Sequence, residues 1–372
     1  MRIAIDATRA VNEKAGVGRF TKELIENLLE IDKKNEYILL FNFWRNFKEK
    51  SKEAQKFKRE NSEIKISRLP GRIKEGLLSG PIGYVERMKV EADIFLAPTF
   101  LDCDLHLKIP QIVIIHDLTV FRFPEHLGMN LSRRYQKINK QVLEKAFKVI
   151  AISESTKKDL IDLLDVPAAK IKVIYPGLFQ FRPQKSLPLD LKNKSYILNV
   201  GTVEPRKNLE ILLEGYALLS NHLREQFPLV VVGASGWKNA PIYKKWQNLN
   251  LQDRVIFTGF LKDEELASLY QHASCFVYPS IYEGFGLPVL EALDFGVPVI
   301  TSKVSSLPEA GGKAVIYIDP KKPEEIGRNL KKILTIPKLT YKYQKLGKIQ
   351  AQKFTWKKTA AEFIKVFKSA TI

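Results

Sequence analysis

A strand–turn–helix stretch in the second half of this 372-residue chain constrains its fold more than any other part of the sequence. The apolar run SCFVY (274–278) predicts a buried strand, and LPVLEALD (287–294) predicts a helix with a proline in its first turn. Between them, Gly284 and Gly286 let the backbone approach a ligand closely. The arrangement indicates an anion site, because the first N–H groups of a helix lack partners and the helix dipole favours negative charge.

Two glutamates, Glu283 and Glu291, flank this turn. A helical path between them would span about 12 Å, whereas the paired carboxylates of retaining glycoside hydrolases lie about 5 Å apart. The two are therefore poorly spaced to act on one bond and better spaced to hold two ends of an elongated ligand. The alternative is a solvated loop glutamate and a glutamate on a wet helix face.

Strand and helix patterns alternate along both halves of the chain, which predicts an α/β protein of two doubly wound domains with a cleft between them. We expect the first domain at 1–177, a Pro- and Lys-rich linker at 178–194 and the second domain at 195–353. The strands are expected at 2–7, 36–43, 93–97, 110–118, 149–152, 170–175, 196–201, 228–234, 254–258, 274–278, 297–301 and 314–318. Residues 8–17 are expected to form a loop.

The net charge of +19 fits three kinds of partner: nucleic acid, an anionic membrane surface or a phosphate-bearing substrate. Many of the bases lie in residues 45–91, with acids between them, so a solvated helix face is the alternative. No nucleic-acid-binding motif is present, and no apolar run approaches the ~20 residues of a membrane span. The two cysteines, Cys103 and Cys275, lack metal-ligand spacing and favour a reducing compartment.

Three further groups are candidate ligand contacts. The adjacent cations Arg206 and Lys207 follow a predicted strand and indicate an anion nearby, with solvated surface charge as the alternative. Gly16 and Gly18 follow the first strand, where a plain tight turn is the alternative. His116 ends a buried strand, at the edge where ligands meet such sheets, unless a neighbouring backbone group satisfies its ring. The tripeptide Asp-Cys-Asp at 102–104 is interpreted as a chance occurrence and not as a metal site.

The frame YPSxYEGFGLPxLEA at 278–292 resembles the retaining, nucleotide-sugar-dependent glycosyltransferases of the GT4 family, which have the GT-B fold. The resemblance extends to the first domain, where His116 and its flanking residues match, and it is greatest to the bacterial mannosyltransferase-like branch. It implies that the final helix, 354–372, crosses back to the first domain.

The resemblance also implies roles for the residues. Arg206, Lys207 and the N–H groups of Gly284, Phe285, Gly286 and Leu287 would bind the donor diphosphate, with Gly16 and Gly18 facing it; Glu291 would hold the ribose, Phe260 and Leu261 would lie along the base, and Glu283 and His116 would lie at the transferred sugar. Thr202 stands where many members have an arginine, and Arg206 would substitute for it.

The implied function is transfer of a hexose, mannose from GDP-mannose, to a hydroxyl of a glycan or lipid-diphosphate-linked acceptor. No metal and no cofactor are expected, and the protein is expected to be cytoplasmic, with a peripheral position on the inner face of the cell membrane. The alternatives are a UDP- or ADP-sugar donor, a GT-B phosphorylase or epimerase, an inactive relative, and a basic nucleic-acid-binding protein without transferase activity.

Overall fold

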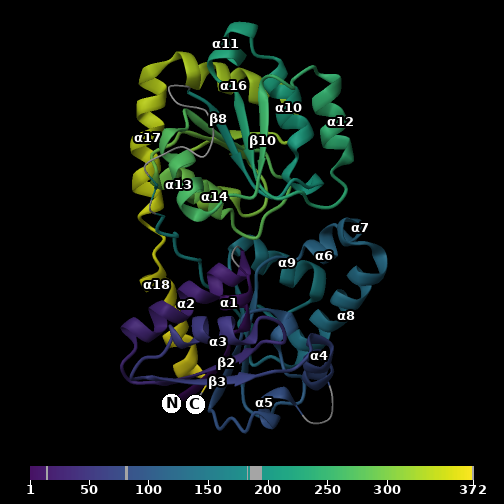
Figure 1. Cartoon of the computed structure of the whole chain (residues 1–372), viewed down its shortest axis with the longest axis vertical. Helices are drawn as coiled ribbons and strands as arrows, with labels where there is room; N and C mark the ends of the chain where they lie inside the picture. Colours follow the sequence, from purple (N-terminus) through teal and green to yellow (C-terminus); the bar gives the residue numbers. More distant parts are fainter. Residues whose placement is uncertain (14–15, 80–82, 182, 185–194, 371–372) are drawn as a thin grey trace. The chain divides into compact units, whose positions relative to one another are not determined.

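The computed structural model describes residues 1–13, 16–79, 83–181, 183–184 and 195–370 (Figure 1). The chain divides into two compact units. Unit 1 contains Met1–Gly177 together with Thr355–Ile372, and unit 2 contains Leu178–Phe354. The linker expected at 178–194 falls largely on residues outside the described part of the chain.

Unit 1 is built on a parallel sheet whose described strands run in the order β3-β2-β1-β4-β5-β6-β7. The strands are β1 (Arg2–Asp6), β2 (Glu36–Asn42), β3 (Ser62–Ser67), β4 (Ile94–Ala97), β5 (Gln111–Ile115), β6 (Lys148–Ala151) and β7 (Ile171–Val173). The helices are α1 (Thr8–Asn12), α2 (Val17–Ile31), α3 (Phe47–Gln55), α4 (Gly71–Ser79), α5 (Tyr84–Arg87), α6 (Thr119–Arg122), α7 (Pro124–Leu127), α8 (Met129–Lys145), α9 (Glu154–Leu164) and α18 (Trp356–Ser369), with 3-10 turns η1 (Phe100–Asp102) and η2 (Ala168–Lys170).

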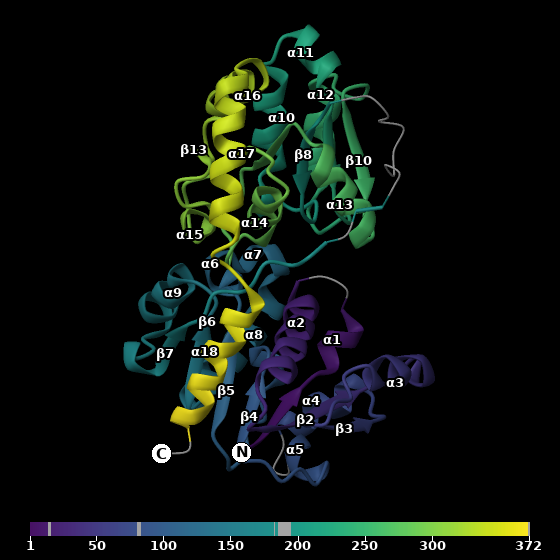
Figure 2. The same cartoon turned by 90° about the vertical axis from the view of Figure 1, so that its left-hand side faces the viewer.

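Helices cover both faces of this sheet, as its runs of buried apolar residues require. On one face, side chains of α4, α5, α8 and α9 pack against the strands in a single apolar cluster. On the other face, α2 lies beside α18, the last helix of the chain (Figure 2). There the Phe20 and Trp356 rings meet edge to face at 5.1 Å, and Thr359 donates a hydrogen bond to the carbonyl of Tyr175.

Unit 2 is a second parallel sheet, with its described strands in the order β10-β9-β8-β11-β12-β13. The strands are β8 (Ile197–Val200), β9 (Leu229–Val232), β10 (Val255–Gly259), β11 (Cys275–Tyr278), β12 (Val299–Ser302) and β13 (Ile316–Ile318). The helices are α10 (Leu209–Ala217), α11 (Asn221–Gln226), α12 (Ala240–Asn248), α13 (Asp263–His272), α14 (Leu287–Asp294), α15 (Leu307–Gly311), α16 (Pro323–Thr335) and α17 (Pro337–Ala351), with the 3-10 turn η3 (Pro205–Lys207). Side chains of α10, α12 and α16 form one apolar cluster with the strands.

The predicted strands are present, with ends that differ by up to three residues. In unit 1 a strand was missed and a helical segment was assigned as a loop. Strand β3 reads SEIKIS, and its mostly half-buried residues within a basic segment give a weak strand signal. Residues 8–17, expected to be a loop, contain the five-residue helix α1 and the start of α2. No helix of the described residues is long and apolar enough to cross a membrane.

Within unit 1, the contact of Trp356 with Phe20 of α2 predicts an effect on stability. Trp356 is 5% exposed, so Trp356→Ala is expected to destabilise unit 1 by about 3–5 kcal/mol, the usual cost of truncating a buried tryptophan. Hydrogen–deuterium exchange should then be faster in peptides of α2 while peptides of α10 keep their protection. The control Lys357→Ala removes only an exposed ion pair with Glu30 and should change stability by less than about 1 kcal/mol. Unchanged exchange in α2 would contradict the packing role.

Candidate functional site

The candidate site of unit 2 lies at the carboxyl ends of β8 and β11. These strands are neighbours, yet the chain leaves β8 toward β9 on one side and returns to β11 on the other. In open parallel sheets, ligands bind at such a topological switch point, beyond the carboxyl ends of the strands. The loop after β8 carries Arg206 and Lys207, and the loop after β11 carries Glu283.

Three charged side chains meet there in a buried ion cluster. The Lys207 ammonium donates to Glu283 Oε1 at 2.6 Å, and the Arg206 guanidinium donates to Glu283 Oε2 at 2.8 Å. The Tyr278 hydroxyl donates to the same carboxylate at 2.9 Å and accepts from Lys207 at 2.7 Å. The sequence predicted an anion beside Arg206 and Lys207. In the structure, the side chain of Glu283 is the anion that pairs with both.

Backbone and side-chain contacts hold this cluster in place. Arg206 also pairs with Glu204 at 2.8 Å and donates to the Tyr282 carbonyl at 3.0 Å. The backbone of Glu283 is fixed from the loop after β12, because its N–H donates to Ser305 and its carbonyl accepts from Ser306. The serines were not predicted from sequence, since only the fold brings their loop beside the turn.

The electrostatics of the cluster follow from its burial. Burial alone would raise the pKa of Glu283, but Arg206 and Lys207 outweigh it and lower that pKa to about 2. Burial lowers the pKa of Lys207, an effect that Glu283 opposes. With Glu204 and Glu283 ionised, the two carboxylates balance the two cations. The cluster is therefore close to electrically neutral.

The predicted glycine turn and helix start adjoin the cluster. Gly286 is the N-cap of α14 and has φ 103°, a conformation that favours glycine. A Cβ there would lie 2.8 Å from a Leu307 methyl carbon, so the position is also sterically restricted. Pro288 has no N–H and the Val289 N–H donates to the Gly286 carbonyl at 2.9 Å, so the N–H of Leu287 is left without an acceptor in the helix.

Glu291 lies on α14, where Tyr270 donates a hydrogen bond to its carboxylate at 2.9 Å. Glu283 is 7% exposed and Glu291 is 5% exposed. The alternative of two solvated glutamates is therefore wrong. Both carboxylates have hydrogen-bonding partners, as the cost of burying a carboxylate requires.

Two exposed aromatic side chains lie at the same edge of the sheet. Phe260 follows β10 and is 57% exposed, and Trp237 lies in the loop after β9 and is 39% exposed. Their loops are adjacent, because the Gly233 N–H donates to the Gly259 carbonyl at 3.0 Å. Phe260 and Leu261 were predicted contacts. Trp237 was missed, although the sequence Gly-Trp-Lys between a strand and a helix is a signal for it.

The remaining predicted residues belong to unit 1. His116 follows β5, and its Nε2 lies 2.9 Å from the Pro98 carbonyl, so a backbone group does satisfy one ring nitrogen. Burial lowers the pKa of His116 to about 4, which leaves the ring neutral at physiological pH. Gly18 is inside α2, where a Cβ would lie 2.3 Å from the Glu13 carbonyl oxygen; Gly16 is the exposed N-cap of that helix. A residue without a side chain is needed at position 18 because the end of α1 lies directly against α2 there.

The carboxylates of the 102–104 tripeptide have separate partners. Asp102 accepts from Arg9 at 2.8 Å and from Thr99 at 2.7 Å. Asp104 accepts from the backbone N–H groups of Val85 and His106. The two side chains thus hold different loops of unit 1.

Comparisons with known proteins agree with this geometry. Residues 182–369 match the family described as glycosyl transferases group 1, and residues 15–178 match glycosyltransferase family 4. The chain is 32% identical to O-antigen chain mannosyltransferase B of Escherichia coli, over 69% of this chain and 70% of that protein. It is 30% identical to the serotype-specific mannosyltransferase WbdA of Escherichia coli over 67% of this chain, and the match spans 32% of that longer protein.

Among solved structures, sucrose-phosphate synthase from Thermosynechococcus elongatus superposes with a TM-score of 0.77 at 20% identity, over 99% of this chain and 98% of that one. The likeness shows the shared GT-B fold of two Rossmann-like domains. The matched families cover nearly the whole described chain, and the resemblance inferred from the 278–292 frame is confirmed. The chain belongs to glycosyltransferase family 4 and is a glycosyltransferase of the GT-B fold.

Proposed function

We propose that unit 2 binds a nucleoside diphosphate sugar at the carboxyl edge of its sheet, and that the chain transfers the hexose to an acceptor hydroxyl with retained anomeric configuration. The observation that carries this proposal is the buried cluster of Arg206, Lys207 and Glu283 at the switch point, beside the N-terminus of α14. Cations and a helix N-terminus at one place fit a diphosphate.

The chemistry follows from that charge distribution. A bond forms between the acceptor oxygen and the anomeric carbon, the bond from that carbon to the diphosphate oxygen breaks, and the acceptor proton passes to the departing phosphate. Negative charge develops on the diphosphate, where Arg206, Lys207 and the N–H groups of Phe285, Gly286 and Leu287 would stabilise it. These groups supply positive charge without a metal ion.

The other residues would position the rest of the donor. Glu291 and Glu283 would hold the ribose and the sugar, and Phe260 and Leu261 would lie along the base. His116 of unit 1 would act through hydrogen bonding and not through charge, because its pKa is lowered to about 4 by burial.

The donor proposed is GDP-mannose, because the relatives matched over most of the chain are named mannosyltransferases. A UDP- or ADP-sugar is the competing donor, since backbone groups in the Gly259–Leu261 loop distinguish bases weakly. A thermal-shift titration against GDP-mannose, UDP-glucose and ADP-glucose tests this, with and without EDTA.

The expected outcome is a selective shift with GDP-mannose that EDTA does not change. A ligand that binds only the folded protein stabilises it by about 2.7 kcal/mol at a hundredfold excess over its dissociation constant. A larger thermal shift with another nucleotide sugar would assign that compound as the donor in place of GDP-mannose. The absence of a shift with any donor at saturation would contradict donor binding.

The acceptor proposed is a glycan, free or linked to a lipid diphosphate, with the protein cytoplasmic and peripheral at the inner face of the cell membrane. The relatives are named for O-antigen chains, and exposed bases, with acids between them, lie along residues 45–59 of unit 1. Trp44 and Ile73, each next to an exposed arginine, are 53% and 50% exposed. Exposed apolar side chains within a basic surface fit an anionic interface.

Removal of either side of the ion cluster is expected to stop transfer. Lys207→Ala should lower kcat/KM by about 10²–10³-fold, the usual cost of losing one group that stabilises developing charge. Glu283→Gln should also lower kcat/KM, because Glu283 positions both cations. The measurement is release of GDP from GDP-mannose with a membrane extract as acceptor, with folding checked by circular dichroism. Lys244→Ala, an exposed change on α12, serves as the control. Near-normal turnover by a folded Lys207 or Glu283 variant would refute the assignment.

The same cluster predicts how stability depends on pH. Glu283→Gln leaves buried Arg206 and Lys207 without their shared anion, so it should cost about 3–5 kcal/mol at pH 7. The pKa of Glu283 in the folded protein is about 2, below its ordinary 4.5. The stability that ionised Glu283 contributes is therefore complete above pH 4.5 and is lost as the pH falls toward 2.

Urea unfolding is measured at pH 7, 5, 4 and 3.5. The difference in unfolding free energy between wild type and Glu283→Gln should become smaller below pH 4.5. Glu324→Gln, an exposed change on α16, should cost less than about 0.5 kcal/mol throughout. If this difference in unfolding free energy instead increased in acid, Glu283 would not be the ionised partner of these cations.

A further inference from the structure

Two buried lysines lie over tyrosine rings, one in each unit. In unit 2 the Lys207 ammonium is 5.0 Å from the centre of the Tyr278 ring, and in unit 1 the Lys74 ammonium is 5.1 Å from the centre of the Tyr84 ring. Both lysines are 8% exposed, so the attraction of each ammonium to the ring face acts with little screening by water. The two clusters differ in the partner of the tyrosine hydroxyl.

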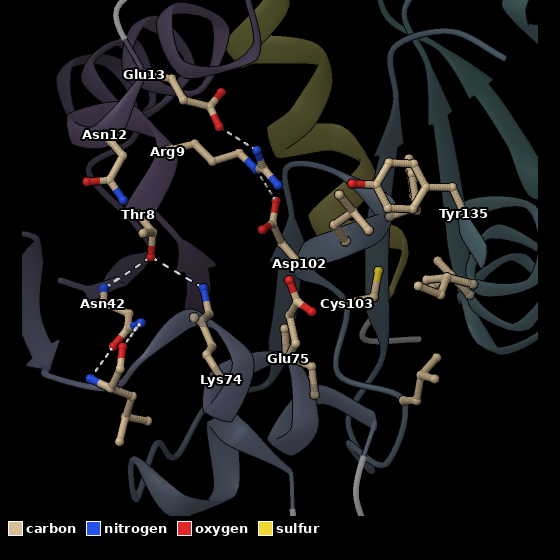
Figure 3. A pocket seen from close by; sticks show the side chains of 18 of the residues that line it. Thr8, Arg9, Asn12, Glu13, Asn42, Lys74, Glu75, Asp102, Cys103 and Tyr135 are labelled. Carbon is tan, nitrogen blue, oxygen red and sulfur yellow. Dashed lines mark hydrogen bonds and ion pairs between the residues drawn. The ribbon is translucent and has the colours of Figure 1, made fainter. Parts of the chain in front are cut away.

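The cluster of unit 1 lies at a cavity of about 770 Å³. The cavity is lined by the segments that follow β1, β2, β3 and β4 and by helices α4 and α8 (Figure 3). Lys74 is bonded there to Asp6 and lies 3.4 Å from the Thr8 hydroxyl. The Tyr84 hydroxyl is paired with Ser67 instead, at 2.9 Å. A carboxylate and a threonine thus hold the lysine of unit 1, and the tyrosine hydroxyl takes no part.

The charge of Lys74 is well compensated by its neighbours. Burial lowers the pKa of Lys74, but Asp6 and Asp102 outweigh burial and raise that pKa above its ordinary value. Lys74 therefore stays charged through the contacts of unit 1 alone, as a structural ion pair does.

The charge of Lys207 is compensated less well. Burial lowers the pKa of Lys207, and Glu283 does not fully offset this effect, because Arg206 shares the same carboxylate and adds to the lowering. Glu204, the other acid of the cluster, pairs with Arg206 at 2.8 Å. A further negative charge beside Lys207 would therefore be favourable.

The Tyr278 hydroxyl connects Lys207 to Glu283. It accepts from the ammonium at 2.7 Å and donates to Glu283 Oε1 at 2.9 Å, and the ammonium donates to that oxygen at 2.6 Å. An ammonium has three N–H groups. Two of those of Lys207 have these acceptors, and the third has none within the part of the chain that the structure describes. The third N–H is thus left for a ligand.

The hydroxyl of Tyr278 keeps its proton. Burial raises the pKa of Tyr278 well above its ordinary value, and the charge of Glu283 raises it further. The proton is shared with the carboxylate, so the hydroxyl oxygen is left to accept from Lys207.

The positions of the tyrosine and of the lysine stem are both fixed. Tyr278 is 1% exposed and ends β11, where its carbonyl accepts from Thr301 of β12 at 2.7 Å. Its ring stacks on Phe276, with the ring centres 5.8 Å apart. The backbone of Gly201, after β8, lies close to the lysine stem, since a Cβ there would be 3.2 Å from Lys207 Cε. The Lys207 side chain therefore has little freedom to move.

We propose that Tyr278 is a positioning residue of the donor site: with Glu283 it occupies two N–H groups of Lys207 and so reserves the third for the donor diphosphate. Tyr278 does not contact the reacting atoms and acts through Lys207. This role rests on the proposed function, in which Lys207 stabilises the negative charge that develops on the diphosphate. A phenylalanine at position 278 would keep the ring and remove the acceptor that orients the ammonium.

The first test compares Tyr278→Phe with Tyr84→Phe in the full chain. Each change removes one hydroxyl and keeps the ring over a buried lysine. Turnover is measured as release of GDP from GDP-mannose with a membrane extract as acceptor, and folding is checked by circular dichroism. Tyr278→Phe should lower kcat by about 10–100-fold, the range for a lost hydrogen bond to a charged group. Tyr84→Phe should keep the kcat of the wild type. An unchanged kcat in Tyr278→Phe, or equal losses in both variants, would overturn the proposal.

A double-mutant cycle tests whether Tyr278 acts through Lys207. When Lys207 is already replaced by alanine, the added change Tyr278→Phe should lower kcat by no more than about twofold, because the group that it positions is absent. A further loss of about tenfold or more would show that Tyr278 acts independently of Lys207, which contradicts the proposal.

The pH profile gives a readout that a purely structural hydroxyl would not change. The Tyr278 oxygen accepts from the ammonium and favours its charged form, so Tyr278→Phe should lower the pKa of Lys207. The alkaline limb of kcat/KM, followed from pH 7 to pH 10, should then move to lower pH. Glu283, Arg206 and Glu204 also face Lys207 and are the same in both variants. The limb should stay in place in Tyr84→Phe, and a limb that stays in place in Tyr278→Phe would contradict the role.

Failure of this role is distinguishable from failure of the proposed function. Normal transfer by Tyr278→Phe, with a thermal shift of the wild type by GDP-mannose, would overturn the positioning role and leave the donor site as proposed. The absence of a thermal shift of the wild type with any nucleotide sugar would contradict donor binding, and the role of Tyr278 would be refuted with it.

Discussion

The bonds of one carboxylate to two cations organise the site of unit 2. Glu283 holds Arg206 and Lys207 at 2.8 and 2.6 Å, and this connects the loop after β8 to the loop after β11. Burial of any one of these charges alone would be costly, so each requires the others. The serines after β12 bond to the backbone of Glu283 and so hold this nearly neutral cluster beside the N-terminus of α14.

Much of the fold could be predicted, because most strands of both sheets are short runs of buried apolar residues between turn residues. The exceptions have physical reasons. Strand β3 has several half-buried residues and lies in a basic segment, so neither its pattern nor its composition is that of a buried strand. The helix α1 has five residues and no apolar period. Gly18 looked like part of a phosphate loop, and the structure explains it by the contact of α2 with α1.

The chemical types of the site could be named from sequence, but their pairing could not. Lys207 and Glu283 are 76 residues apart, and they meet because the order of the strands places β8 next to β11. The cavity of unit 1 was less predictable still. Each of four loops gives it a few side chains, and none of those loops carries a motif that names a ligand. Sequence spacing shows which residues of one helix or strand lie close together. At the edge of a sheet, the residues that meet come from several loops that are far apart in the sequence.

The placement of α18 has a consequence for how the protein is made. Unit 2 is one continuous segment, Leu178–Phe354, whereas unit 1 needs residues from both sides of it. During translation, unit 2 can therefore be complete before unit 1 is, which reverses the usual order of domains along a chain. Until Trp356–Ser369 leaves the ribosome, the face of α2 that holds Phe20 has no cover from the last helix. The growing chain thus exposes this apolar surface of α2 while the residues between α2 and α18 are made.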